Sequence, residues 1–239
     1  MYTIIKKELR QFFSGMPGYI TIGIFLLITG IIVFILPESG VLDAGYASLD
    51  SFFSLAPYLM LFLMPAITMR SLSDEYRSGT FEVLRTAPVS IRDLIIGKFI
   101  ACFLVALLAL LCTFVYPISI SFLSTDGIDT GGIAGSYIGL MLLCGVYASI
   151  GIFTSSIQQN AVTAFLIAAL ICFMGYSVFD SIAAIEGLPY SVGYYISQAG
   201  IMQHYQNISK GYVDSRDVVY FLSLIFFFLY LTIQRVKAR

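Results

Sequence analysis

Residues 70–99 of this chain read RSLSDEYRSGTFEVLRTAPVSIRDLIIGKF. This stretch holds 9 of the 27 charged residues in the sequence, and long apolar runs flank it on both sides. Charged side chains are costly to place in hydrocarbon, so a polar insertion between two membrane spans must lie outside the bilayer. We therefore expect the stretch to be available for contact with a soluble partner.

The overall composition indicates that this chain is surrounded by lipid. Hydrophobic residues make up 59% of the sequence and charged residues 11%, compared with about 45–50% and about 25% in soluble domains. A soluble chain of 239 residues could not bury so much apolar surface. We expect an all-α polytopic membrane protein that forms a single transmembrane domain over residues 1–239.

Six apolar runs are long enough, or nearly so, to cross the roughly 30 Å of hydrocarbon in a bilayer as helices. They comprise residues 19–36, 52–69, 99–122, 133–154, 161–179 and 218–233, and none contains Asp, Glu, Lys or Arg. Pro57 and Pro65 in the second run and Pro117 in the third predict kinks, because proline removes an intrahelical hydrogen bond. Ser90 and Asp93 fit a capping box at the start of the third helix.

The distribution of charge predicts the orientation. If both termini are cytoplasmic, that side receives 11 of the 13 Lys and Arg residues, and only Lys210 and Arg216 lie outside. Basic residues in short loops set topology, so we expect cytoplasmic N- and C-termini. Residues 1–16 place apolar and basic side chains on opposite faces of a helix, which predicts an interfacial amphipathic helix. A basic flank that only enforces topology is the alternative.

The sequence offers no catalytic constellation of its own. Gly97-Lys98 is followed by Phe99 and lacks the glycine spacing of a phosphate loop. The four cysteines fall in apolar runs, where cysteine behaves as a small hydrophobic residue. We expect His204, the single histidine, to be a loop or interfacial residue, and we expect no cofactor or metal on this chain. No span carries an ionisable group, so energy for transport must arrive from outside the membrane core.

Local signals within the polar stretch predict one short helix. Gly79 breaks the chain, Thr80 follows as the N-cap, and Glu82 lies in the first turn, where the helix dipole favours an acidic residue. The helix extends over residues 81–87 across the cytoplasmic face, and Pro88 stops it. On local physics alone, a solvated loop that carries topological charges is the alternative.

Three segments of this stretch carry a family resemblance. Residues 74–84 (DEYRSGTFEVL), 87–90 (APVS) and 97–98 (GK) resemble the E-x-R-x-G-T-x-E-x-L…P-x-S…GK signature of ABC-2-type transporter permeases. The resemblance extends to the basic N-terminal helix, the six spans and the long outer segment before the last span. In detail the chain most resembles the permease subunit of the gliding-motility-associated ABC transporter of Bacteroidota.

This resemblance implies a type V exporter-like fold in the bacterial inner membrane. Residues 70–93 would form a cytoplasmic coupling segment that docks on a separate ABC ATPase subunit, and that subunit would bind ATP and Mg. A single coupling helix per permease implies a second permease copy or a sister membrane subunit. The implied partners are these subunits and the lipid bilayer, and nucleic acid is not among them.

The same resemblance assigns roles to residues of the coupling segment. Glu75 and Arg77 would form ion pairs with the ATPase or with adjacent helices. Gly79 would make the turn and Thr80 the cap. The docking surface and the end of the helix would comprise Phe81, Glu82, Leu84 and Pro88.

Residues 180–217 form a long extracytoplasmic segment before the last span. Tyr190, Tyr194 and Tyr195 are candidates for an outer gate, since the family has short re-entrant helices there that cap the outer mouth of the pathway. Residues 181–185 and 193–201 are the expected helices. An aromatic belt at the lipid–water boundary is the alternative.

Three glycines open the fourth span at a spacing of four residues. Gly131, Gly135 and Gly139 would let another helix approach closely. Packing within the chain is the commoner outcome of such a stripe, and a contact with a second copy is the alternative.

Three functions compete at this stage. The first is a permease subunit that couples a separate ATPase to export or envelope work, including gliding motility. The second is a non-transporting scaffold that transmits ATPase motion to an envelope machine, and the third is an intramembrane enzyme, for which the spans offer no nucleophile–base pair. The uniformly apolar spans favour a lipid-like or drug-like substrate of a generic ABC-2 exporter, or none.

Overall fold

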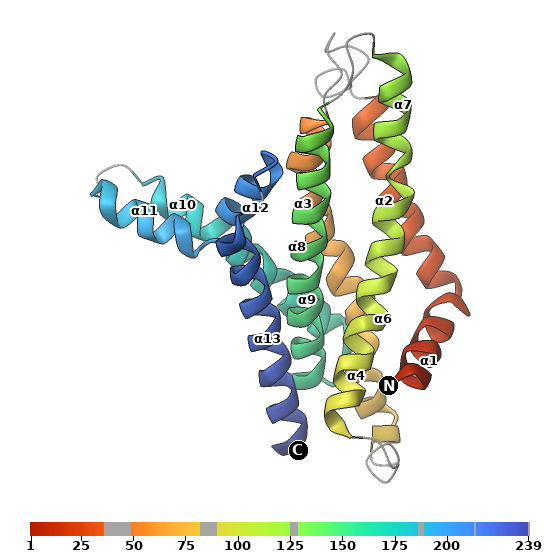
Figure 1. The fold of residues 1–239 in the computed structure, drawn as a ribbon. Helices are drawn as coiled ribbons and strands as arrows, with labels where there is room; N and C mark the ends of the chain where they lie inside the picture. Colours follow the sequence, from red (N-terminus) through yellow and green to blue (C-terminus); the bar gives the residue numbers. More distant parts are fainter. Residues whose placement is uncertain (36–48, 82–89, 125–128, 186–188, 213, 239) are drawn as a thin grey trace.

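The computed structural model describes residues 1–35, 49–81, 90–124, 129–185, 189–212 and 214–238. Every regular element in these ranges is a helix, which confirms the all-α prediction. Long helices lie side by side in Figure 1, and the two termini lie at the same end of the bundle. The helices are α1 (Tyr2–Phe13), α2 (Met16–Phe34), α3 (Asp50–Thr68), α4 (Arg70–Arg77), α6 (Ile91–Cys112), α7 (Val115–Leu123), α8 (Thr130–Ile157), α9 (Ala161–Phe173), the π-helix η1 (Met174–Val178), α10 (Phe179–Ala183), α11 (Tyr190–Ala199), α12 (Ile201–Ser209) and α13 (Ser215–Ala238).

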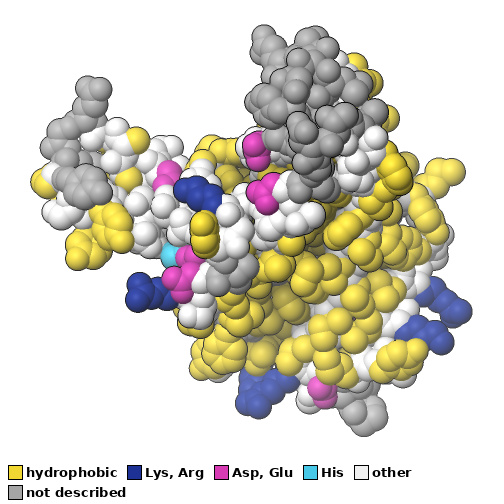
Figure 2. Space-filling model, turned by 45° about the horizontal axis from the view of Figure 1, so that its top comes forward, with side chains coloured by type: hydrophobic (Ala, Val, Ile, Leu, Met, Phe, Trp, Pro, Cys, Tyr) yellow, Lys and Arg dark blue, Asp and Glu magenta, His cyan; other side chains and the backbone are white. Residues whose placement is uncertain are grey.

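Five helical stretches are long and apolar enough to cross a membrane, and a bent pair of helices would make the sixth span. The bent pair is α1 followed by α2, with an angle of 70° between them. The five stretches are Asp50–Arg77, Ile91–Phe122, Thr130–Ile157, Ala161–Ala183 and Ser215–Ala238. In Figure 2, hydrophobic side chains cover the flank of these spans, with Lys and Arg toward the borders of the apolar surface.

The fourth span, α8, lies at the centre of the bundle and contacts α3, α6, α9, α12 and α13. Its inner residues include Leu140, Leu143 and Tyr147, which are all fully buried. The glycine stripe lies on its face toward α12. A Cβ atom at Gly139 would lie 3.1 Å from the ring of Tyr205, and one at Gly135 would collide with the carbonyl oxygen of Ile208 in the last turn of α12.

The third glycine, Gly131, lies in the same region, because a Cβ on Gly211 would come within 3.3 Å of its backbone. The stripe therefore packs against a helix of its own chain, which corresponds to the within-chain alternative. This close approach positions α12 against the outer half of α8.

Two of the span prolines lie four residues after a carbonyl that accepts a hydrogen bond from a tyrosine of another helix. Pro57 cannot donate to the carbonyl of Phe53, and the hydroxyl of Tyr205 donates to it at 2.8 Å. Pro117 lies four residues after Thr113, whose carbonyl accepts from the hydroxyl of Tyr137 at 3.1 Å. Both bonds are buried. The carbonyl of Thr113 also accepts from the N–H of Tyr116 at 2.9 Å, so the tyrosine at Pro117 adds a second donor.

The outer segment differs in detail from the prediction. The fifth span passes through the π-helix η1 directly into α10, which begins at Phe179, two residues before the expected start. The second expected helix corresponds to α11, and a third helix, α12, was not predicted. Figure 1 shows α10 and α11 extending sideways from the spans. A π-helical turn is rare in a span and shifts the helix register, which no sequence period reveals.

Candidate functional site

The candidate site lies at the end of the bundle that carries both termini, where α1, α4 and α6 meet (Figure 1). α4 follows α3 almost without interruption, since the N–H of Met69 still donates to the carbonyl of Pro65 at 2.8 Å. α6 begins after Ser90, whose side chain accepts from the N–H of Asp93 at 3.1 Å and donates to its carboxylate at 2.8 Å. The predicted cap of the third span is confirmed.

The centre of the site is Lys98, whose side chain is only 1% exposed. Its ammonium donates to Glu8 Oε1 and to Glu75 Oε1, each at 2.8 Å, and to the carbonyl of Ser71 at 2.7 Å. An ammonium has three donors, so all of them are used. We call Lys98, Glu8, Glu75 and Ser71 the Lys98 cluster; it joins α1, α4 and α6.

The electrostatics of the Lys98 cluster depend on burial. One ammonium faces two carboxylates, and Lys7, which is largely exposed, lies 3.9 Å from Glu75 and balances the remaining charge. The second oxygen of Glu75 is buried and accepts no hydrogen bond among the described residues. A buried pair adds little net stability, but removal of one partner leaves an uncompensated charge. The cluster therefore fixes the relative positions of three helices.

A turn follows α4. Gly79 has a φ of +70°, a conformation that glycine adopts without the steric cost paid by other residues. The hydroxyls of Ser78 and Thr80 are 2.8 Å apart. Helical conformation resumes at Thr80 itself, so Thr80 is the first helical residue and not the preceding cap that the sequence predicted. Its hydroxyl is directed back toward α4, because Ser78 offers the nearer partner.

Phe81 is placed differently from the expectation. Its side chain is 6% exposed and its ring lies 4.8 Å from that of Tyr76. It belongs to a small buried cluster with Leu72, Ile95 and Ile152. The ring is apolar and finds a dry space between α4, α6 and α8, so it packs inside its own chain and is not part of an exposed docking face.

The other coupling candidates fall into two groups. Arg77 is exposed at the end of α4 and forms no ion pair within the described ranges. Glu82, Leu84 and Pro88 lie outside the described residues. The predicted role of this segment in docking stays a prediction.

At the opposite end, the tyrosine candidates lie on α11. Tyr194 and Tyr195 are 51% and 73% exposed, and their rings meet edge-on at 5.8 Å. Tyr190 is the first residue of α11, and only its backbone is described. Neither a gate nor an aromatic belt follows from this placement alone.

His204 is buried on α12, which corrects the expectation of a loop or interfacial residue. Its Nδ1 lies 2.5 Å from Asp217 Oδ1 at the start of α13, and its Nε2 lies 2.9 Å from the carbonyl of Gln198. The ring also stacks on Tyr220 at 3.9 Å. Both nitrogens face acceptors, so the pair links α12 to α13. Within the described ranges, no group of three His, Cys, Asp or Glu side chains could hold a metal.

Sequence reasoning missed Glu8 and Lys98 as a pair. The available signal was Lys98 itself, the last charged residue before an uncharged apolar run, within a helix that begins several residues earlier. Such a lysine must either extend to the interface or find a carboxylate. Which carboxylate it finds depends on how α1 folds back, and a single sequence does not contain that angle.

Comparison with known families agrees with this arrangement. A family model described as ABC-2 family transporter protein matches residues 43–233. The chain belongs to the ABC-2 transporter family. Glu75 and Lys98 of the ABC-2 protein lie inside the matched region, whereas Glu8 precedes it. A search of curated proteins finds no match.

The family places the ABC-2 protein among multi-pass membrane transporter subunits. Permeases of this family lack nucleotide-binding motifs and generally partner with an ABC ATPase subunit. The chain is therefore a transmembrane permease of an ABC transporter.

Proposed function

We propose that this permease receives the motion of a separate ATPase, which binds ATP and Mg, at the end of the bundle formed by α1, α4 and α6. The observation that carries the proposal is the Lys98 cluster. It joins three helices at one buried ammonium, next to the segment that resembles the coupling helix of the family. Displacement of this segment would move all three helices together.

The second span is suited to transmit such a displacement. α3 and α4 form a nearly continuous helix from Asp50 to Arg77, so a push on the segment after Arg77 acts on the whole span. Lys98 ties the lower part of this helix to α6 and to the interfacial helix α1. The bond from Tyr205 to the carbonyl of Phe53 ties its upper part to α12. The span is held near both ends.

The orientation follows from the same end of the molecule. Both termini, α4 and the start of α6 lie together (Figure 1), and their Lys and Arg side chains are those that the charge bias assigns to the cytoplasm. We propose cytoplasmic termini and a bacterial inner membrane. One coupling segment per chain implies a second permease copy or a sister membrane subunit to engage an ATPase dimer.

The work done by the complex is proposed from the resemblance. Export of a lipid-like substrate and envelope work in gliding motility both fit a permease with uniformly apolar spans. A scaffold that only transmits ATPase motion would use the same coupling segment. Purified complex in liposomes separates these functions, because only a transporter changes the distribution of an amphiphile across the bilayer when ATP is added.

Gly79→Val tests the coupling proposal. Valine is strained at the positive φ of Gly79, so the segment after α4 is expected to point elsewhere. We expect the variant to insert and fold, and to lose ATPase co-purification and ATP-dependent activity by about tenfold or more. Arg77→Glu, which reverses an exposed charge beside the turn, should weaken ATPase binding with salt-dependent severity.

The matched control is Lys6→Glu, a charge reversal at an exposed position of α1 outside the coupling segment. It should retain ATPase binding. Normal ATPase co-purification and activity by Gly79→Val would overturn the proposal.

A further inference from the structure

Two hollows adjoin at the bend between α1 and α2. The first, of about 260 Å³, lies between α1, the start of α2, the end of α3, α4 and the middle of α6. The second, of about 400 Å³, lies beside the Lys98 cluster. They share five lining residues, namely Glu8, Gln11, Arg70, Ser71 and Asp74. The two hollows are therefore parts of one site.

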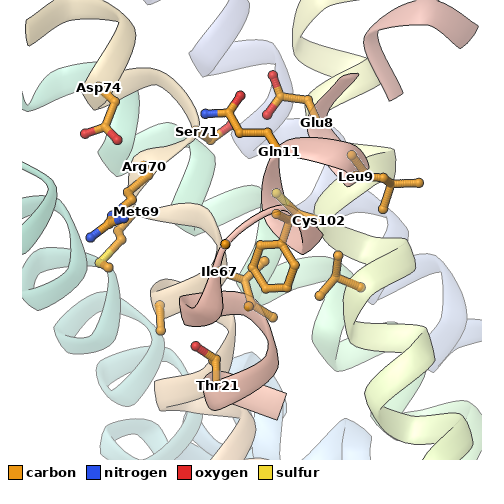
Figure 3. A pocket seen from close by; sticks show the side chains of 16 residues that line it. Glu8, Leu9, Gln11, Thr21, Ile67, Met69, Arg70, Ser71, Asp74 and Cys102 are labelled. Carbon is orange, nitrogen blue, oxygen red and sulfur yellow. The ribbon is translucent and has the colours of Figure 1, made fainter. Parts of the chain in front are cut away.

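The linings of the two hollows differ in polarity. Beyond the shared residues, the first is walled mainly by apolar side chains such as Phe12, Ile67 and Val105. Every residue that lines the second is polar or charged. In Figure 3 the labelled polar side chains of Asp74, Ser71, Gln11 and Glu8 lie toward one end of the pocket, and the apolar Ile67 lies farther from that end. Such a gradient fits an amphiphile.

The site lies where an amphiphile of the bilayer would meet the protein. The sequence predicts that α1 is an interfacial amphipathic helix, and α2 turns away from it by 70°. On that prediction, the bend lies at the level of the lipid headgroups. The apolar hollow is smaller than the about 300–1,000 Å³ of a site for a whole drug-sized ligand. It has room for part of one acyl chain.

The polar hollow offers charges of both signs that are not engaged elsewhere. Lys98 is saturated by Glu8, Glu75 and Ser71. The side chains of Arg70 and Asp74 make no ion pair or hydrogen bond within the described ranges. The hydroxyl of Ser71 is buried and has no hydrogen-bond partner there.

The formal charge of the polar hollow is balanced. Three basic residues (Lys7, Arg70 and Lys98) face three acidic ones (Glu8, Asp74 and Glu75). A balanced site with one free guanidinium and one free carboxylate complements a headgroup that carries a phosphate and an ammonium. An anionic headgroup would leave Asp74 facing a like charge.

We infer that this site binds a phospholipid with a phosphoethanolamine headgroup. Arg70 takes the phosphate, Asp74 takes the ammonium, and one acyl chain enters the hollow between α1, α3 and α6. The lipid lies beside the Lys98 cluster and fills the space between the interfacial helix and α4. The inference does not depend on the ATPase or on the cargo.

Native mass spectrometry of the purified full-length chain tests the inference. The delipidated chain is mixed with equal amounts of phosphatidylethanolamine, phosphatidylcholine and phosphatidylglycerol of the same acyl chains. We expect one phosphatidylethanolamine per chain to be retained about tenfold better than the other two lipids. Phosphatidylcholine has no N–H to donate to Asp74, and phosphatidylglycerol has no ammonium, so each lacks one charged hydrogen bond. Chain-free glycerophosphoethanolamine should not bind, because it cannot fill the apolar hollow.

Two variants and one control assign the contacts. Arg70→Gln should weaken retention of all three lipids by about tenfold, and Asp74→Asn should remove the preference for the free ammonium. Arg92→Gln removes an exposed arginine that lines neither hollow and should change nothing. Equal retention of the three lipids, equal behaviour of the three variants, or binding of the chain-free headgroup would each overturn the inference.

Discussion

At the scale of the residue, Lys98 is the most constrained group in the ABC-2 protein. It is buried at the foot of a membrane span and satisfied by two carboxylates and a carbonyl from two other helices. Residues that are costly to bury are retained where they specify one arrangement of the elements around them, and we interpret Lys98 in this way. The buried His204–Asp217 pair holds α12 to α13 in the same manner at the other end.

Lys98→Met should lower the free energy of unfolding by about 3–5 kcal/mol, because the largely buried Glu8 then has no counter-ion and Glu75 keeps only Lys7 at 3.9 Å. Unfolding by denaturant in detergent micelles measures the change. The triple variant Lys98→Met, Glu8→Gln, Glu75→Gln should recover most of the loss, since no charge is left unpaired. Lys7→Met is the control: its side chain is 57% exposed and lies 3.9 Å from Glu75, so removal of an exposed pair should cost about 0–1 kcal/mol. Equal effects of the two single variants would contradict this account of the Lys98 cluster.

At the scale of the element, the proline kinks depend on side chains from other helices. Pro57 cannot donate to the carbonyl of Phe53, and Tyr205 donates to it instead. At Pro117, Tyr137 donates to the carbonyl of Thr113 beside the N–H of Tyr116. These bends are tertiary features as much as local ones. The sequence predicts that a kink occurs at a proline, and it does not predict which helix stabilises it.

Tyr205→Phe should lower the free energy of unfolding by about 1–3 kcal/mol, because it removes the donor to the buried carbonyl of Phe53. Tyr137→Phe should cost less, because the carbonyl of Thr113 keeps the N–H of Tyr116 at 2.9 Å. Tyr58→Phe is the matched control, because the Tyr58 hydroxyl makes no hydrogen bond in the part of the chain that the structure describes. Thermal unfolding of the three purified variants in one detergent gives the comparison. A loss for Tyr58→Phe as large as that for Tyr205→Phe would show that the carbonyl bonds are not the cause.

At the scale of the whole molecule, the apolar runs predicted the class of protein and the approximate positions of five spans, and the first predicted span corresponds to α2, which counts as a span only together with α1. The irregularities and bends of the helices were less predictable from the sequence. The π-helix in the fifth span, the third outer helix α12 and the 70° bend before α2 arise from packing between elements distant in sequence. The same distinction applies to the candidate site. Gly79 and Ser90 predicted local turns from the sequence, whereas the contact between Glu8 and Lys98 depends on tertiary packing. Phe81 was assigned outward because its burial depends on three other helices.

The proposed orientation can be measured in intact cells. Tyr212→Cys, at an 80% exposed position after α12, should react with a membrane-impermeant maleimide added outside, whereas Arg77→Cys should react only after lysis. A background in which the exposed native Cys112 is replaced by serine limits other labelling. Labelling of Arg77→Cys in sealed cells would reverse the proposed topology.

The two-ended attachment of α3 has a thermodynamic consequence. Its extension α4 is bound to Lys98 and its N-terminal half to Tyr205, so a displacement at either end of this helix acts on the other. If nucleotide on the ATPase favours one position of this helix, any outer ligand that favours the same position must tighten nucleotide binding by an equal factor. A cargo or envelope partner that contacts only α12 would then be detectable from the cytoplasm, as a change in the affinity of the ATPase for ATP.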